Sequence, residues 1–142
     1  MRSLLDVNVL LALMDEGHAH HQRVTAWWNA SAEPSWASCP LTQNGFIRII
    51  SQASYPGRRS LGDAIALLRL QITHPRHAFW PDDVSLLDPM RVDEHYVVSP
   101  RKLTDVYLLA LAVRHGGRFV TLDAGISTAA VVDARDEHLL RL

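Results

Sequence analysis

Cysteine, lysine and long apolar runs are almost absent from this sequence. A single cysteine, Cys39, excludes an internal disulfide, so the composition indicates a reducing compartment and does not indicate secretion. No stretch reaches the roughly 18 apolar residues that a membrane-spanning helix needs. Asp6 and Asn8 interrupt the apolar run near the N-terminus, and no small-residue cleavage pattern follows it, which argues against a signal peptide. We therefore expect a cytoplasmic protein that does not enter a membrane.

The sequence also lacks a strong excess of charge of either sign. The 14 Lys and Arg residues against 15 Asp and Glu residues give a net charge of -1, which excludes a global attraction to nucleic acid. All but one of the cations are arginine, the better phosphate ligand, so any polyanion site must be a local patch. A length of 142 residues with 48% hydrophobic content and no repeat or linker predicts one globular domain, residues 1–142.

Short apolar runs alternate with segments of helical periodicity along the chain. The apolar runs predict strands at residues 3–5, 34–37, around 79, 119–122 and 131–132. Apolar spacing and capping residues predict helices at residues 8–14, 18–30, 41–51, 61–72 and 104–115, and Gly116 and Gly117 end the last of them. This alternation is typical of an α/β fold with a mainly parallel sheet.

Three aspartates stand where such a fold places its ligand site. Asp6 interrupts the apolar run LLDVNVLLAL, and because an unpaired buried carboxylate is costly, it needs a partner. Asp6 follows the first strand and Asp123 follows the strand at 119–122, and ligands of open α/β sheets bind beyond the carboxyl ends of strands. Asp105 opens the helix at 104–115 and shares a face with Leu109 and Ala112. We expect these three carboxylates to meet in one cleft.

Three carboxylates in one cleft repel one another, which raises their pKa values unless a cation neutralises them. Mg²⁺ suits such a site because it binds a few carboxylates and keeps several waters. A metal-bound water is a nucleophile near neutral pH, and the metal stabilises charge on a phosphoryl oxygen, so the set predicts phosphodiester hydrolysis. Each aspartate alone also has a purely structural explanation, as a cap, a helix-dipole partner or a turn residue.

Several motifs in fixed order resemble a known family. The segments LLDVNVLLAL, HAHHQRVTAWW, WASCPLTQNGFIRI and LTDVYLLALAVRHGGRFVTLD, with the closing turn, resemble the PIN-domain ribonucleases, and more closely the VapC-type toxins of bacterial toxin–antitoxin pairs. The resemblance implies a three-layer α/β/α sandwich and an acidic site that binds Mg²⁺ or Mn²⁺. It also implies endonucleolytic cleavage of RNA, a homodimer, and inhibition by a small VapB-like antitoxin.

The resemblance also assigns residues to the site. Asp6, Asp105 and Asp123 match three acids of the family, which are its catalytic and metal-binding residues. Asn8 matches the polar residue that follows the first acid, and Thr121 matches the hydroxyl residue that precedes the last.

One position departs from the family pattern. Many relatives have a glutamate in the helix after the second strand, where Gln43 aligns here, or Asn44 if the register shifts by one residue. Either amide can position a water or donate a carbonyl ligand but carries no negative charge. The departure implies weaker metal binding.

Four cations fall in predicted turns, where they could hold RNA phosphates near the acidic cleft, although solubility is a competing explanation. They are Arg58, Arg59, Arg101 and Lys102.

Two other function classes compete with the nuclease. The first is an aspartyl phosphotransferase or phosphatase, in which Asp6 would be the nucleophile, Asn8 would replace the second acid of a D-x-D motif, and Lys102 would neutralise phosphate. The second is a catalytically weakened PIN-like binding module, which the missing glutamate favours.

Overall fold

A five-stranded parallel sheet lies at the centre of the computed structural model, which describes residues 1–142. The strands pair in the order β3-β2-β1-β4-β5, and every pairing is parallel. Their bounds are β1 Ser3–Leu5, β2 Trp36–Ser38, β3 His77–Phe79, β4 Arg118–Thr121 and β5 Leu139–Arg141. The first strand of the chain is therefore the central one, and its two neighbours come from distant parts of the sequence.

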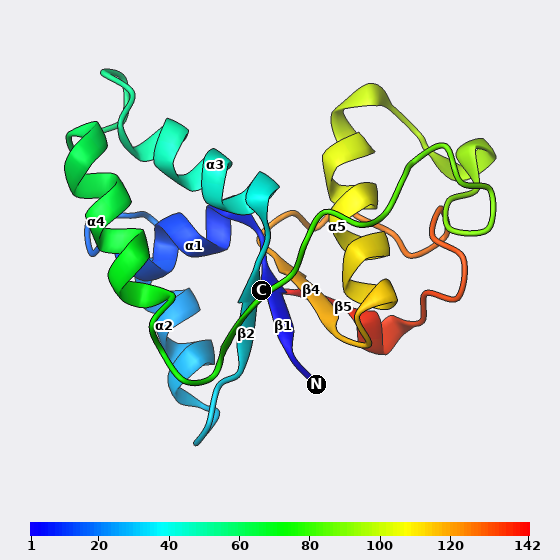
Figure 1. Ribbon diagram of the computed structural model, residues 1–142, viewed down its shortest axis with the longest axis horizontal. Helices are drawn as coiled ribbons and strands as arrows, with labels where there is room; N and C mark the ends of the chain where they lie inside the picture. The colour runs from blue at the N-terminus through cyan, green and yellow to red at the C-terminus, as the bar shows by residue number, and fades with distance from the viewer.

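Helices cover both faces of the sheet, as Figure 1 shows. One face carries α1 Val7–Met14, α2 His21–Asn29, α3 Pro40–Ile50 and α4 Leu61–Gln71, and the other carries α5 Leu103–Arg114. Three short 3-10 helices complete the chain, η1 Glu94–Tyr96, η2 Pro100–Lys102 and η3 Asp136–His138. This arrangement confirms the predicted α/β/α sandwich.

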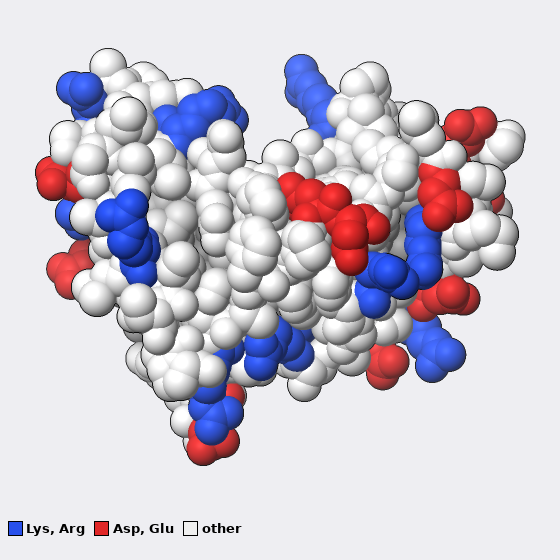
Figure 2. Space-filling view, in the orientation of Figure 1, with Lys and Arg blue, Asp and Glu red and all other residues white.

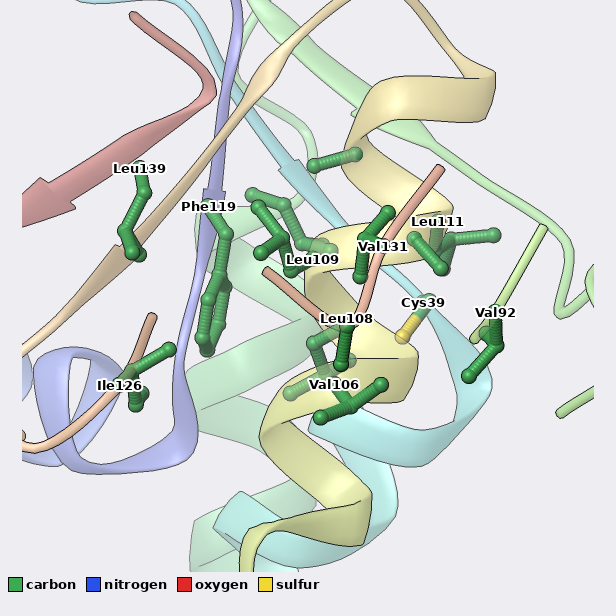
Figure 3. Close-up of a cluster of buried hydrophobic side chains, with 14 of the residues drawn as sticks. Cys39, Val92, Val106, Leu108, Leu109, Leu111, Phe119, Ile126, Val131 and Leu139 are labelled. Atoms are coloured by element: carbon green, nitrogen blue, oxygen red, sulfur yellow. The ribbon is translucent and has the colours of Figure 1, made fainter. Parts of the chain in front are cut away.

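Each strand places successive side chains in two different cores because side chains alternate across a sheet. Leu5, Trp36 and Val120 pack with the helices α1 to α4. The neighbouring positions Leu4 and Phe119 join the second core with α5, which Figure 3 shows around Phe119 and the leucines of the helix. Strands buried on both faces need apolar residues at successive positions, which explains Leu4 and Leu5 in β1 and Phe119 and Val120 in β4.

Local capping explains where the helices start and stop. Pro40 occupies the first turn of α3, and Thr42 Oγ1 accepts a 3.0 Å hydrogen bond from the backbone N–H of Cys39. Ser60 Oγ accepts a 3.1 Å hydrogen bond from the backbone N–H of Asp63 at the start of α4. After α5, Gly116 adopts a φ of 64°, which only glycine reaches without strain. The predicted glycine stop is confirmed.

Three details of the sequence prediction are wrong. The run at residues 131–132 is no strand, because Val131 forms only an isolated antiparallel bridge to Val92 and is buried in the core beside α5. The last strand is instead β5, where Leu139 and Leu140 pair with β4. The helix expected from residue 18 begins at His21, after a turn.

The third detail concerns the first helix. It begins at Val7 and not at residue 8, and Asp6 occupies its N-cap position. No helix of the molecule combines the length and the apolar character needed to cross a membrane.

Candidate active site

Asp6 lies at the junction of β1 and α1, at the carboxyl edge of the sheet. Its backbone N–H donates a 3.0 Å hydrogen bond to the carbonyl of Val120, which continues the pairing of β1 with β4. Its side chain is buried, with 8% exposed, and accepts a 2.8 Å hydrogen bond from Thr121 Oγ1. Asp6 therefore joins the ends of the two central strands.

Thr121 connects two of the predicted acids. Its fully buried hydroxyl donates to Asp6 and accepts a 3.0 Å hydrogen bond from the backbone N–H of Asp123. The hydroxyl residue thus sets the direction of the Asp6 carboxylate and the path of the chain that carries Asp123.

Asp123 is held by two donors. Lys102 Nζ lies 2.5 Å from Asp123 Oδ2 in an ion pair, and the backbone N–H of Gly125 donates a 2.7 Å hydrogen bond to Oδ1. The hydrogen bond from Lys102, followed by that from Gly125, lowers the pKa of Asp123. Asp123 is therefore ionised and already paired with a cation of the protein.

Asp105 lies in the first turn of α5, half-buried, and its side chain has no hydrogen bond or ion pair with any other side chain. Burial first, and then the negative charges of Asp6 and Asp123, raise its pKa to about 6 against the opposing charge of Lys102. Burial also raises the pKa of Asp6, which the Thr121 hydrogen bond partly offsets. The structure thus brings the three predicted carboxylates close enough for their charges to interact.

The amide residues are not bonded to these acids. Gln43 Nε2 donates a 2.9 Å hydrogen bond to Ser38 Oγ, which lies 2.8 Å from Nε2 of His77. Asn44 is exposed and lines a shallow pocket at the start of α4, while Asn8 is exposed on α1. The Ser38–His77 contact joins strands far apart in the chain, and no sequence signal pointed to it.

Of the four cations singled out in turns, Lys102 alone contacts the acids. Arg58 donates from Nε to the carbonyl of Ser51 at 3.1 Å, and Arg59 acts on Asp15, which follows the C-terminus of α1. Both arginines therefore lie toward the opposite end of α1 from Asp6. Arg101 is exposed and forms no ion pair.

The donors fit a hard divalent cation, although they do not form a closed ligand set as they stand. No group of three or more His, Cys, Asp or Glu side chains is arranged to hold a metal ion. The three side chains nevertheless offer carboxylate oxygens, the ligands that Mg²⁺ and Mn²⁺ prefer, and the charges of Asp6 and Asp123 add to burial in raising the pKa of Asp105. A pocket of about 90 Å³ adjoins the site, lined by Lys102, Asp105 and Gly125 on its polar side.

Sequence comparisons place the chain among named relatives. The family model of the PIN domain matches residues 3–132. The chain is 52% identical to Ribonuclease VapC44 of Mycobacterium tuberculosis over 143 residues, covering 100% of both chains. It is 43% identical to Ribonuclease VapC38 of the same organism over 129 residues, covering 90% of this chain and 89% of the relative.

Two crystal structures share the fold at low sequence identity. VapC20 of Mycobacterium tuberculosis, described as a Sarcin-Ricin loop cleaving toxin, superposes with a TM-score of 0.61 at 17% identity, covering 94% of this chain and 98% of that one. VapBC2 of Rickettsia felis, bound to a DNA fragment from its promoter, gives a TM-score of 0.58 at 8% identity, covering 100% and 98%.

Proposed function

Because the chain belongs to the VapC-type branch of the PIN-domain family, we propose that it is a Mg²⁺- or Mn²⁺-dependent endoribonuclease, the toxin of a type II toxin–antitoxin pair. The observation that carries the proposal is the group of three interacting carboxylates, Asp6, Asp105 and Asp123. They come from β1, α5 and the end of β4, and they gather at the edge of the sheet where open α/β folds bind ligands. The names of the relatives support RNA as the substrate.

Asp6, Asp105 and Asp123 would hold the divalent ion. When bound, the ion supplies Lewis-acid stabilisation of a phosphoryl oxygen and lowers the pKa of water. Thr121 keeps the Asp6 carboxylate directed into the site through a buried hydrogen bond. Asp105, which has no competing side-chain partner, is free to turn its oxygens to a ligand.

The surface around this edge suits an anionic polymer. The strands in Figure 1 run toward the upper side of the view, where Figure 2 shows a notch between the two helical layers. Lys and Arg side chains flank the notch on both sides, and acidic side chains lie below it. Cations at the rim would bind the phosphates of the polyanion, and the carboxylates below them would bind the metal ion. Hydrolysis of a polyanion needs both kinds of charge at one site.

The partners follow from the same assignment. We propose a small VapB-like antitoxin, as the VapBC2 complex has two components, a homodimer, and a cytoplasmic location. We further propose that residues 1–142 act as one nuclease domain, with Gln43 or Asn44 in the place of the usual glutamate.

The phosphotransferase alternative finds less support. It needs Asp6 as an accessible nucleophile with Lys102 beside it, but Asp6 is buried and Lys102 contacts Asp123. A covalent phosphate on Asp6 would favour it over the nuclease.

RNA cleavage by the purified full-length chain tests the proposal. We expect cleavage of structured RNAs with Mg²⁺, none with EDTA, and a loss on the order of 100-fold in Asp6→Asn, because a metal ligand is lost. Asp63→Asn changes an exposed acid in the first turn of α4 and is the matched control. Equal cleavage by wild type and Asp6→Asn would show that the activity comes from a contaminant and would reject the assignment.

A further inference from the structure

We infer that the Lys102 ammonium is a built-in counter-ion, which occupies the carboxylate of Asp123 in the metal-free protein and leaves it when a divalent ion binds. The inference rests on the proposed function, because it assigns the ion to the same acidic site. This role differs from the one expected from the sequence, in which Lys102 binds RNA phosphates.

Lys102 is set apart from the other cations by composition and by position. It is the only lysine of the chain, ends η2 immediately before α5, and lies three residues before Asp105. Its side chain is 25% exposed, whereas its neighbour Arg101 is exposed and unpaired. A compact ammonium on a flexible stem is easier to place and to release than a planar guanidinium fork.

The backbone at Gly125 lies close to the contact between Lys102 and Asp123. A Cβ atom at position 125 would lie 3.0 Å from Lys102 Nζ and 3.1 Å from Asp123 Oδ1, so Gly125 leaves the room that the pair occupies. Lys102 takes one oxygen of Asp123, and the N–H of Gly125 takes the other. A metal ion that binds at Asp123 therefore comes next to one of these donors, and the side chain moves away more easily than the backbone.

Lys102 and a divalent metal ion compete for Asp123 because both are positively charged. Lys102 is the cation that acts on both Asp105 and Asp123, and at Asp105 it opposes burial and the charges of Asp6 and Asp123, which together still raise the pKa to about 6. A divalent ion supplies two charges where Lys102 supplies one, and it bonds several carboxylates at once. An ammonium left beside that ion would face like charge at short range. The side chain also lines the adjoining pocket, which gives it a way out of the contact.

The single lysine provides a direct measurement. Succinimidyl acetate labels Lys102 and the N-terminal amine, and mass spectrometry of peptides separates the two sites. We expect saturating Mn²⁺ to increase the labelling rate of Lys102 roughly three- to fivefold, because a partly exposed ion pair contributes a free energy of that size. The labelling rate of the N-terminal amine should not change. An unchanged Lys102 rate at a Mn²⁺ concentration that calorimetry shows to be saturating would overturn the inference.

A pair of matched variants gives an independent readout. Lys102→Gln should bind Mn²⁺ roughly fivefold more tightly by calorimetry, because the competing cation is gone, and should melt at a lower temperature than wild type in EDTA. Arg101→Gln removes the neighbouring cation outside the contact and should change neither value. Equal Mn²⁺ affinity in Lys102→Gln and wild type would reject the displacement.

The outcomes for the counter-ion and for the nuclease can be told apart. If Mn²⁺ binds and RNA is cleaved but Lys102 labelling stays constant, the counter-ion is wrong and the nuclease stands. If neither wild type nor Lys102→Gln binds Mn²⁺, both the metal-dependent function and the counter-ion are rejected.

Discussion

Asp105 and Asp123 show how neighbouring carboxylates acquire opposite properties from their surroundings. Asp105 is half-buried without a partner, so burial and two like charges raise its pKa to about 6. The pKa of Asp123 is lowered because Lys102 and Gly125 donate to its ionised form. The same residue type thus weakens the metal-free fold at one position and strengthens it at the other.

We predict that Asp105→Asn stabilises the metal-free protein at neutral pH. The raised pKa means that the folded state holds the proton more tightly than the unfolded state. The stability from this proton is present below the unfolded pKa near 3.8 and is lost as pH rises through about 6. In EDTA at pH 7 the variant should be more stable by about 1 kcal/mol, discounted for partial exposure, and at pH 4 the difference should be much smaller. Urea unfolding of the variant and of wild type at pH 7 and at pH 4 measures the difference in the free energy of unfolding.

Asp123→Asn is the matched opposite case. Its lowered pKa contributes stability that is present above the unfolded pKa and is lost as pH falls through the folded pKa. This variant should therefore be less stable than wild type at pH 7 and approach it in acid. A destabilised Asp105→Asn at pH 7 would contradict the electrostatic description of the site.

Between elements, the crossing of α1 and α3 is unusually close beside the site. A Cβ atom at Gly45 of α3 would lie 2.6 Å from Cγ2 of Val7, the first residue of α1. Val7 directly follows Asp6, so the contact fixes the position of the helix start that carries the acid. Valine is stiff at χ1, so it cannot easily turn away.

We predict that Gly45→Ala destabilises the fold by about 1–3 kcal/mol, because the added methyl group overpacks the crossing. Gly62→Ala, in α4, meets no atom within 4 Å and should instead stabilise by about 0.5–1 kcal/mol through helix propensity. Chemical unfolding of both variants beside wild type gives the comparison. A Gly45→Ala variant as stable as wild type would show that α3 shifts freely over α1.

The helices and four of the five strands could be predicted from local signals, whereas the last strand, β5, could not. The apolar spacing of α5, the glycine that ends it and the Ser60 cap of α4 all depend on residues that are close in the sequence. The edge strand β5 has only three residues and becomes a strand because Leu139 finds Phe119 beside it. Val131 carries an equally apolar signal, yet it packs in the core instead.

At the scale of the whole molecule, sheet topology explains why the acidic site could be anticipated from sequence. Asp6 and Asp123 follow parallel strands that are neighbours in the sheet, so their convergence follows from the fold class alone. The Lys102 contact and the Gln43 bond to Ser38 depend on which rotamers the packed structure allows. Such choices are made by tertiary contacts, which leave no pattern in the local sequence.

We predict that metal stabilises the entire chain. At one hundred times its dissociation constant, Mn²⁺ should add about 2.7 kcal/mol to the free energy of unfolding, because it binds the folded state. Melting curves with Mn²⁺ and after EDTA removal test this, and the combined Asp6→Asn, Asp105→Asn variant serves as the control. A melting temperature that does not change at saturating Mn²⁺ would contradict the assignment of the site.

The position of β1 in the sheet also sets the order of events during synthesis. Asp6 is made first, but the Thr121 hydroxyl that holds it comes 115 residues later. Contacts of such separation form slowly and late. A nascent chain therefore carries none of the assembled acidic cluster until β4 has been made and has docked.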